Sequence, residues 1–215
     1  MGAYENGVTT RKIILDACEK LFYEKGYHNT SYDDICRKAH VNRGSIYYHF
    51  KEKENIRYEV LWEMTTRCYE DAKKYCENSD YKFMLGTYIF WGKTLSDAKL
   101  RRFFLEYYGD YPVYTEKNPG AYYYKLCNQN MFGAFFPMEN IKPLALATVY
   151  GNVYGAIRLI DSFPERYTLL EIFQHIVTTG MMIWGIPKEK ADEIWENMLI
   201  YAEKIPEEEI AKPAV

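Results

Sequence analysis

The sequence predicts an all-α fold. Apolar residues recur at three- and four-residue spacing along most of the 215 residues, as on one face of a helix, and strand-like alternation is hard to find. Residues that begin and end helices, such as serine, asparagine and glycine, stand between these amphipathic segments. Hydrophobic residues make up 48% of the chain and charged residues 27%, which is typical of a globular protein rather than of a disordered one.

The first helix is expected to begin near Thr9 or Thr10, where a hydroxyl can cap it, and to end at Gly26. Between these points the apolar residues form one stripe at helical spacing. The stripe consists of Ile13, Ile14, Ala17, Cys18, Leu21 and Phe22.

A short second helix is predicted to open at Ser31. Ser31 and Asp34 have the spacing of a capping box, and the acidic side chain also favours the positive end of the helix dipole. The helix ends before a turn at His40.

Asn42 is a strong N-cap for a third helix with the sequence RGSIYYHF. Ile46 and Phe50 lie four residues apart on one face of this helix and are expected to point inward. The remaining positions carry arginine, serine, two tyrosines and a histidine. One interpretation is an ordinary polar helix face with half-buried tyrosine rings.

The rest of the chain also reads as helices. A long one is expected from about Glu52 to Glu77, with Ile56, Val60, Met64 and Cys68 along one stripe. Proline and glycine make 109–120 the best loop in the sequence. Further helices are expected at 81–95, 97–108, 120–136, 141–161, 168–184 and 188–204.

Three short helices with a tight turn between the last two predict a helix-turn-helix, whose last helix can enter the major groove of DNA. Side chains at the start of that helix can reach base edges, a glycine there permits close approach, and aromatic and basic side chains can contact phosphates and sugars. These candidates are Arg43, Gly44, Ser45, Tyr47, Tyr48, His49, Lys51 and Lys53.

Residues 10–57, TTRKIILDACEKLFYEKGYHNTSYDDICRKAHVNRGSIYYHFKEKENI, resemble the DNA-binding domain of the tetracycline-repressor-like (TetR) family of bacterial transcriptional regulators. The resemblance adds Thr30 and Ser31 to the expected DNA contacts. Two residues depart from the family's pattern. His40 replaces a usual glycine in the turn, and because histidine adopts the left-handed backbone more easily than most residues, we expect local strain there rather than loss of the turn. Glu52 replaces a usual Ser, Asn or Asp helix cap, and its longer side chain caps poorly.

The resemblance implies a helix-turn-helix domain at 1–52 and a larger helical ligand-binding and dimerisation domain at 53–215. It further implies a homodimer, with 141–161 and 168–184 at the interface, and a two-fold symmetric double-stranded DNA operator. Gly151-x-x-x-Gly155 places two small residues on one helix face, which suits close helix packing either between subunits or within one.

The function that follows is a ligand-responsive transcription regulator, expected to act as a repressor that a small aromatic or lipophilic effector releases. The helix that begins near Glu52 is expected to couple the effector site to the DNA-binding domain. Each aromatic residue taken singly is better explained as ordinary core. The candidate pocket residues are Met64, Cys68, Tyr88, Trp91, Phe104, Tyr107, Tyr123 and Tyr154.

Other function classes are disfavoured. The net charge is +2 through Tyr58 and −5 beyond it, unlike the strongly basic composition of a nonspecific architectural DNA binder. No nucleophile–base, phosphate-loop or paired-carboxylate motif indicates an enzyme or a cofactor. The five cysteines and four histidines lack metal-ligand spacing, so we expect reduced thiols and no metal. No secretion signal or membrane-spanning run is found, so we expect a cytoplasmic protein with no membrane partner.

Overall fold

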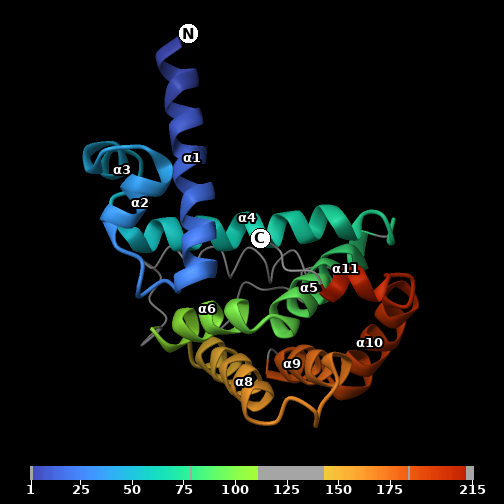
Figure 1. Ribbon diagram of the computed structural model, residues 1–215. Helices are drawn as coiled ribbons and strands as arrows, with labels where there is room; N and C mark the ends of the chain where they lie inside the picture. The colour runs from blue at the N-terminus through green and yellow to red at the C-terminus, as the bar shows by residue number, and fades with distance from the viewer. Residues whose placement is uncertain (1, 78, 111–142, 184, 212–215) are drawn as a thin grey trace. The chain divides into compact units, whose positions relative to one another are not determined.

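The computed structural model describes residues 2–77, 79–110, 143–183 and 185–211, and every regular element in these ranges is a helix (Figure 1). The chain separates into two compact units, residues 1–64 and 65–214. The division falls within α4 (Lys53–Ala72), which therefore contributes to both units. The all-α prediction is confirmed.

The first unit contains α1 (Gly2–Lys25), α2 (Tyr32–Ala39), α3 (Arg43–His49) and the first part of α4. α1 contacts both α2 and α3, which also contact each other. The expected apolar stripes meet in this core, whose buried side chains include Ile14, Cys18, Leu21, Phe22, Ile35, Ile46, Phe50 and Ile56.

α1 ends as predicted but begins earlier. Its last residue is Lys25, and Gly26 follows with φ 89°, a conformation that glycine adopts without strain. The expected start at Thr9 or Thr10 is wrong, because the helix already begins at Gly2. Residues 2–8 contain no proline, so nothing in the backbone chemistry stops the helix there.

The predicted caps of α2 and α3 are both present. The Ser31 Oγ accepts from the Asp34 amide at 3.1 Å while the Asp34 carboxylate accepts from the Ser31 amide at 3.0 Å, which completes the capping box. The Asn42 Oδ1 accepts from the Ser45 amide at 2.8 Å. Each cap satisfies a helix amide that would otherwise lack a partner.

His40 adopts the expected left-handed conformation at the end of α2, with φ 55° and ψ 40°. It is the one non-glycine residue with positive φ among the described residues. The amides of His40 and Val41 both donate to the Cys36 carbonyl, so the turn satisfies a carbonyl at the helix end. These hydrogen bonds hold His40 in a left-handed backbone conformation, in which its β-carbon is sterically crowded.

Glu52 stands where a helix cap is usual, but Asn55 supplies the capping hydrogen bond at the start of α4. Asn55 Oδ1 accepts from the Glu52 amide at 3.1 Å, so the third helical residue caps the residue before the helix. This is the second half of a capping box, supplied by asparagine.

The second unit contains the rest of α4 with α5 (Ser79–Ser96), α6 (Ala98–Gly109), α8 (Pro143–Ser162), α9 (Leu169–Ile183), α10 (Lys188–Ala202) and α11 (Glu207–Ala211). All but α11 were predicted from the sequence, with small differences at their ends. The expected helix at 120–136 lies outside the described residues, as does nearly all of the expected loop at 109–120.

α5 is the central helix of this unit, since it contacts α6, α9, α10 and α11, while α8 packs on α6 and α9. Its apolar residues repeat so densely that the helix is buried along much of its length. Phe90 and Trp91 of α5 pack against Phe104 of α6, with ring centroids 5.2 and 5.8 Å apart. None of the described helices has the length and hydropathy needed to cross a membrane.

Replacing His40 with glycine is expected to raise the free energy of unfolding by about 0.5–1 kcal/mol, because glycine has no β-carbon to strain at positive φ. Urea denaturation followed by circular dichroism measures the change. His40→Ala is the matched control: it also removes the imidazole but keeps the β-carbon, so it should give no gain. Equal stabilisation by both substitutions would attribute the effect to the imidazole instead.

Candidate nucleic-acid interface

α3 is anchored by one side chain and exposes most of the others. Ile46 is fully buried at 0% exposure, whereas Tyr47 is 49% exposed and Tyr48 is 84% exposed. Arg43 and Gly44 at the start of the helix are also exposed. Burial of Ile46 therefore turns the polar positions outward, as the four-residue spacing of Ile46 and Phe50 predicted.

Arg43 is held by an acidic residue on the preceding helix. Its Nε and Nη2 donate to Asp33 Oδ1 at 3.1 and 2.9 Å, and this interaction raises the pKa of Arg43. Both side chains are exposed, and exposed ion pairs are worth little in water. The guanidinium is therefore pre-oriented yet able to exchange Asp33 for the acceptor atoms of guanine or for a phosphate.

Gly44 makes room for the cap of α3. A β-carbon at this position would lie 3.1 Å from Asn42 Oδ1, the atom that accepts from the Ser45 amide. Ser45 Oγ also donates to this oxygen at 3.3 Å. The close fit explains why the smallest residue stands here and leaves the helix start accessible.

The aromatic side chains of α3 are supported by neighbours. The Tyr47 ring lies 5.2 Å from the Tyr32 ring of α2, and the Tyr48 ring lies 5.0 Å edge-on to His49. Burial raises the pKa of Tyr32. These contacts restrict the rings while leaving Tyr48 open to solvent, as side chains that contact a sugar–phosphate backbone require.

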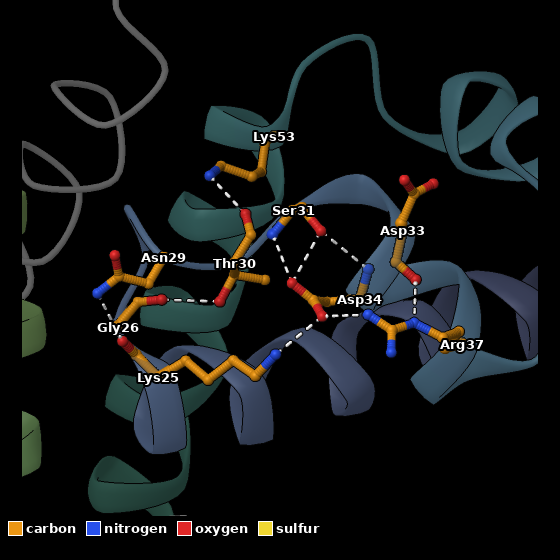
Figure 2. Close-up of polar contacts among 9 residues, drawn as sticks. All are labelled: Lys25, Gly26, Asn29, Thr30, Ser31, Asp33, Asp34, Arg37 and Lys53. Carbon is orange, nitrogen blue, oxygen red and sulfur yellow. Dashed lines mark hydrogen bonds and ion pairs between the residues drawn. The ribbon is translucent and has the colours of Figure 1, made fainter.

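Asp34 gathers the hydrogen bonds that fix the start of α2, as Figure 2 shows. Its carboxylate accepts from the Ser31 amide and hydroxyl, from Lys25 at 2.8 Å and from Arg37 at 2.7 Å. The Lys25 hydrogen bond, followed by those of Ser31, holds the Asp34 pKa far below its usual range. Ser31 itself is exposed at the start of α2.

Thr30 and Lys53, both expected to contact DNA, form hydrogen bonds within the segment between α1 and α2. Thr30 is 1% exposed, and its hydroxyl donates to the Gly26 carbonyl at 2.7 Å (Figure 2). Lys53 donates to the carbonyls of Tyr27 and Thr30 at 2.9 and 2.8 Å, and its Nζ lies 4.2 Å from the centre of the Tyr27 ring. Both side chains stabilise the segment between α1 and α2.

Arg57 strengthens the same region from one turn further along α4. It is 1% exposed, and its guanidinium lies 4.0 Å from the centre of the Tyr27 ring. Glu54 accepts from Arg57 at 3.2 Å and from the Tyr58 hydroxyl at 2.9 Å, so the buried charge has an anionic partner. Sequence analysis did not find this cluster, because a tyrosine 30 residues upstream gives no local signal.

The first unit also contains a cluster of three carboxylates that the sequence did not predict. Oxygens of Asp16, Glu19 and Glu63 lie within 4.8 Å of one another. Lys12 is paired with two of these groups, at 2.8 Å from Asp16 and 2.9 Å from Glu63, and the hydrogen bonds raise its pKa. An ammonium group thus already occupies the position in which a cation would be held.

Five of the candidate effector-pocket residues are buried. Met64, Cys68, Trp91, Phe104 and Tyr107 are each 6% exposed or less. Burial raises the pKa of Cys68 to about 11, so its thiol stays protonated and unreactive at neutral pH.

The other three candidates differ from this group. Tyr88 lines a cavity, Tyr154 is 39% exposed, and Tyr123 lies outside the described residues. Only Tyr88 of the expected set therefore has a described open space beside it.

The N-terminal part of the chain is similar to known proteins. Residues 14–60 match the model of bacterial regulatory proteins of the tetR family. Over 56 residues the chain is 43% identical to the HTH-type transcriptional regulator AcrR of Shigella flexneri, which covers 26% of each protein. Over 75 residues it is 35% identical to the regulator QacR of Staphylococcus aureus, covering 34% of this chain and 40% of QacR. The similarity to these curated relatives thus spans well under two thirds of their length.

A third curated relative is the negative transcriptional regulator IcaR of the icaADBC biofilm operon in Staphylococcus aureus, 38% identical over 55 residues, or 26% of this chain and 27% of IcaR. Among solved structures, RolR in complex with resorcinol aligns over 89% of this chain and 95% of its own, with a TM-score of 0.52 and 14% identity. This similarity extends the common fold to the helices of the second unit.

Replacing Asp34 with asparagine is expected to lower stability at neutral pH, because the amide keeps one acceptor oxygen but loses the charge that attracts Lys25 and Arg37. The folded-state pKa of Asp34 is depressed, so its contribution is present above the unfolded-state pKa of about 4 and is lost as pH falls. The stability difference between wild type and Asp34→Asn should therefore shrink below about pH 4. Urea titrations at several pH values test this, with Asp33→Asn as a control expected to change stability little. A difference that stays constant down to pH 2 would contradict the assignment.

Lys53→Met is expected to lower the free energy of unfolding by about 1–3 kcal/mol, because two carbonyls lose their donor while the apolar stem is kept. Lys51→Met removes an exposed lysine two residues away and should change stability by less than about 0.5 kcal/mol. Chemical denaturation compares the two variants. Equal effects would show that Lys53 is an ordinary surface charge.

Proposed function

Since residues 14–60 carry the DNA-binding domain of the tetR family, we propose that this protein is a sequence-specific transcriptional regulator that binds operator DNA through α3. The observation that carries the proposal is the exposed face of α3, with Arg43 at its start and Tyr47 and Tyr48 along it, around the buried Ile46. The relatives are transcriptional regulators rather than enzymes, and we propose no catalytic role.

In this proposal the side chains of α3 divide into two groups. Arg43 and Ser45 contact base edges, because they lie in the first turn of the helix that enters the major groove. Gly44 permits close approach, and the more distal side chains contact phosphates and sugars. Those phosphate contacts are Tyr47, Tyr48, His49 and Lys51, joined by Ser31 at the start of α2. Thr30 and Lys53 act indirectly, by holding the segment that precedes α2.

We further propose that the protein is a homodimer and binds a two-fold symmetric operator. The outward faces of α8 and α9 support this, since a β-carbon at Gly151 or Gly155 would meet nothing within 4 Å. Large apolar side chains are exposed on the same helices, with Leu144 at 78% and Met182 at 43%. Pairing α8 and α9 with their symmetry copies would cover these faces. Recognition helices would then be about 34–36 Å apart, one turn of DNA.

The proposed action is that of a repressor released by a small effector. IcaR is a negative regulator, which favours repression for a protein with a similar DNA-binding domain. α4 runs from residue 53 in the first unit to residue 72 in the second, so a ligand that displaces it would change the spacing of the two recognition helices. A loss of 5- to 150-fold in DNA affinity needs only about 1–3 kcal/mol of coupling.

The direct test is selection of bound sequences from a randomised double-stranded DNA library at near-physiological salt. Enrichment of a two-fold symmetric motif is the expected result. Recovery of unrelated sequences, with an affinity that depends on salt concentration and not on base sequence, would show that the protein binds DNA nonspecifically.

Arg43→Ala is expected to relax the preference for one base pair in each half-site, at a cost of about 1–3 kcal/mol on the preferred operator. Lys51→Ala should weaken binding to all sequences alike. It should also reduce the slope of the logarithm of the binding constant against the logarithm of salt concentration by about one. Fluorescence anisotropy with the selected operator and a scrambled duplex, at several salt concentrations, separates the two effects. If neither variant differs from the parent, α3 is not the recognition helix.

A further inference from the structure

The second unit contains a cavity of about 580 Å³ between α5, the start of α9 and α11. Its volume is in the range of sites for drug-sized molecules, about 300–1,000 Å³. Leu169, Leu170, Ile210 and the Tyr88 ring provide apolar walls. None of these residues except Tyr88 was a candidate for ligand binding on sequence grounds.

Gly92, which has no side chain, shapes this cavity. A β-carbon on Gly92 would overlap Cγ2 of Ile210 and lie 3.2 Å from Cδ2 of Leu169. Gly92 thus lets α11 and the start of α9 lie directly on α5. The walls are brought together by close backbone packing, which gives the cavity a defined shape.

The charges around the cavity have one sign. Glu207 and Glu208 both line it, and none of the lining residues is lysine or arginine. Both carboxylates are exposed, and neither forms an ion pair or hydrogen bond with any described residue. The next glutamate behaves differently, because Glu209 accepts a hydrogen bond from Tyr75. Two uncompensated negative charges therefore stand at the open side of an apolar cavity.

Tyr88 is a largely buried residue that lines the same cavity. It is 8% exposed, its ring packs 5.1 Å from that of Phe173, and its hydroxyl has no hydrogen-bond partner among the described residues. Burial, together with the nearby charge of Glu207, raises its pKa, so the hydroxyl stays neutral. The hydroxyl oxygen can turn its lone pairs toward a bound positive charge.

We propose that this cavity binds a lipophilic organic cation, with its apolar body between α5, α9 and α11 and its charge beside Glu207 and Glu208. The ring and hydroxyl oxygen of Tyr88 contribute further attraction to the cation. As the effector site, the cavity rests on the proposed function and specifies its ligand class. As a binding site, it stands independently of DNA binding.

The test compares two probes of the same shape and opposite charge, tetraphenylphosphonium and tetraphenylborate, by isothermal titration calorimetry of the full-length protein. Neutralising both carboxylates with Glu207→Gln and Glu208→Gln is expected to weaken tetraphenylphosphonium binding by about tenfold, because each removes a charge near the cation. It should leave tetraphenylborate binding unchanged or stronger. Glu203→Gln, an exposed glutamate beyond the cavity, is the matched control and should change neither affinity.

Equal affinity of the wild type for both probes, or an equal loss with Glu203→Gln, would overturn the proposal, since charge at the cavity would then not select the ligand. Operator binding, measured on the same samples without probe, separates the two hypotheses. Selective binding of the cation without sequence-specific DNA binding would refute the regulator but keep the site. Sequence-specific DNA binding without cation selectivity would support the regulator and refute the cation site.

Discussion

The burial of Ile46 is the constraint on which the DNA-binding surface depends. α3 has seven residues, too few to be stable as an isolated helix, so it persists because Ile46 is packed in the core and Asn42 caps its start. The anchor sets the rotation of the helix about its axis. Every outward position, from Arg43 to Tyr48, takes its direction from that one contact.

Lys53 and Arg57 on α4 place a second constraint on the same domain. Together they enclose the Tyr27 ring, and Lys53 also satisfies two carbonyls in the segment that leads into α2. A movement of the start of α4 would therefore disturb the base of the helix-turn-helix before it reached α3. In the proposed regulator, these cationic side chains link the helix that responds to ligand with the segment that positions α2.

The second unit shows why ligand chemistry is hard to infer from aromatic content. Trp91 and Phe104 pack against each other in the core. The described cavity is instead bounded by residues from three helices that are far apart in the sequence, and these helices pack closely because Gly92 has no side chain. Its charge comes from Glu207 and Glu208 on α11, a short helix that periodicity did not predict. Position in the fold, rather than residue type, distinguishes Tyr88 from the aromatic residues around it.

The sequence by itself determined the helical class, the caps at Ser31 and Asn42 and the inward direction of Ile46 and Phe50. All of these depend on residues within four positions of one another, where backbone geometry alone sets which groups meet. Tertiary structure decided that Lys53 binds the carbonyls of Tyr27 and Thr30, and that Tyr88 and Glu207 line the same cavity. Those partners are separated by 23 to 119 residues in the sequence, and only the packing of whole helices brings them together.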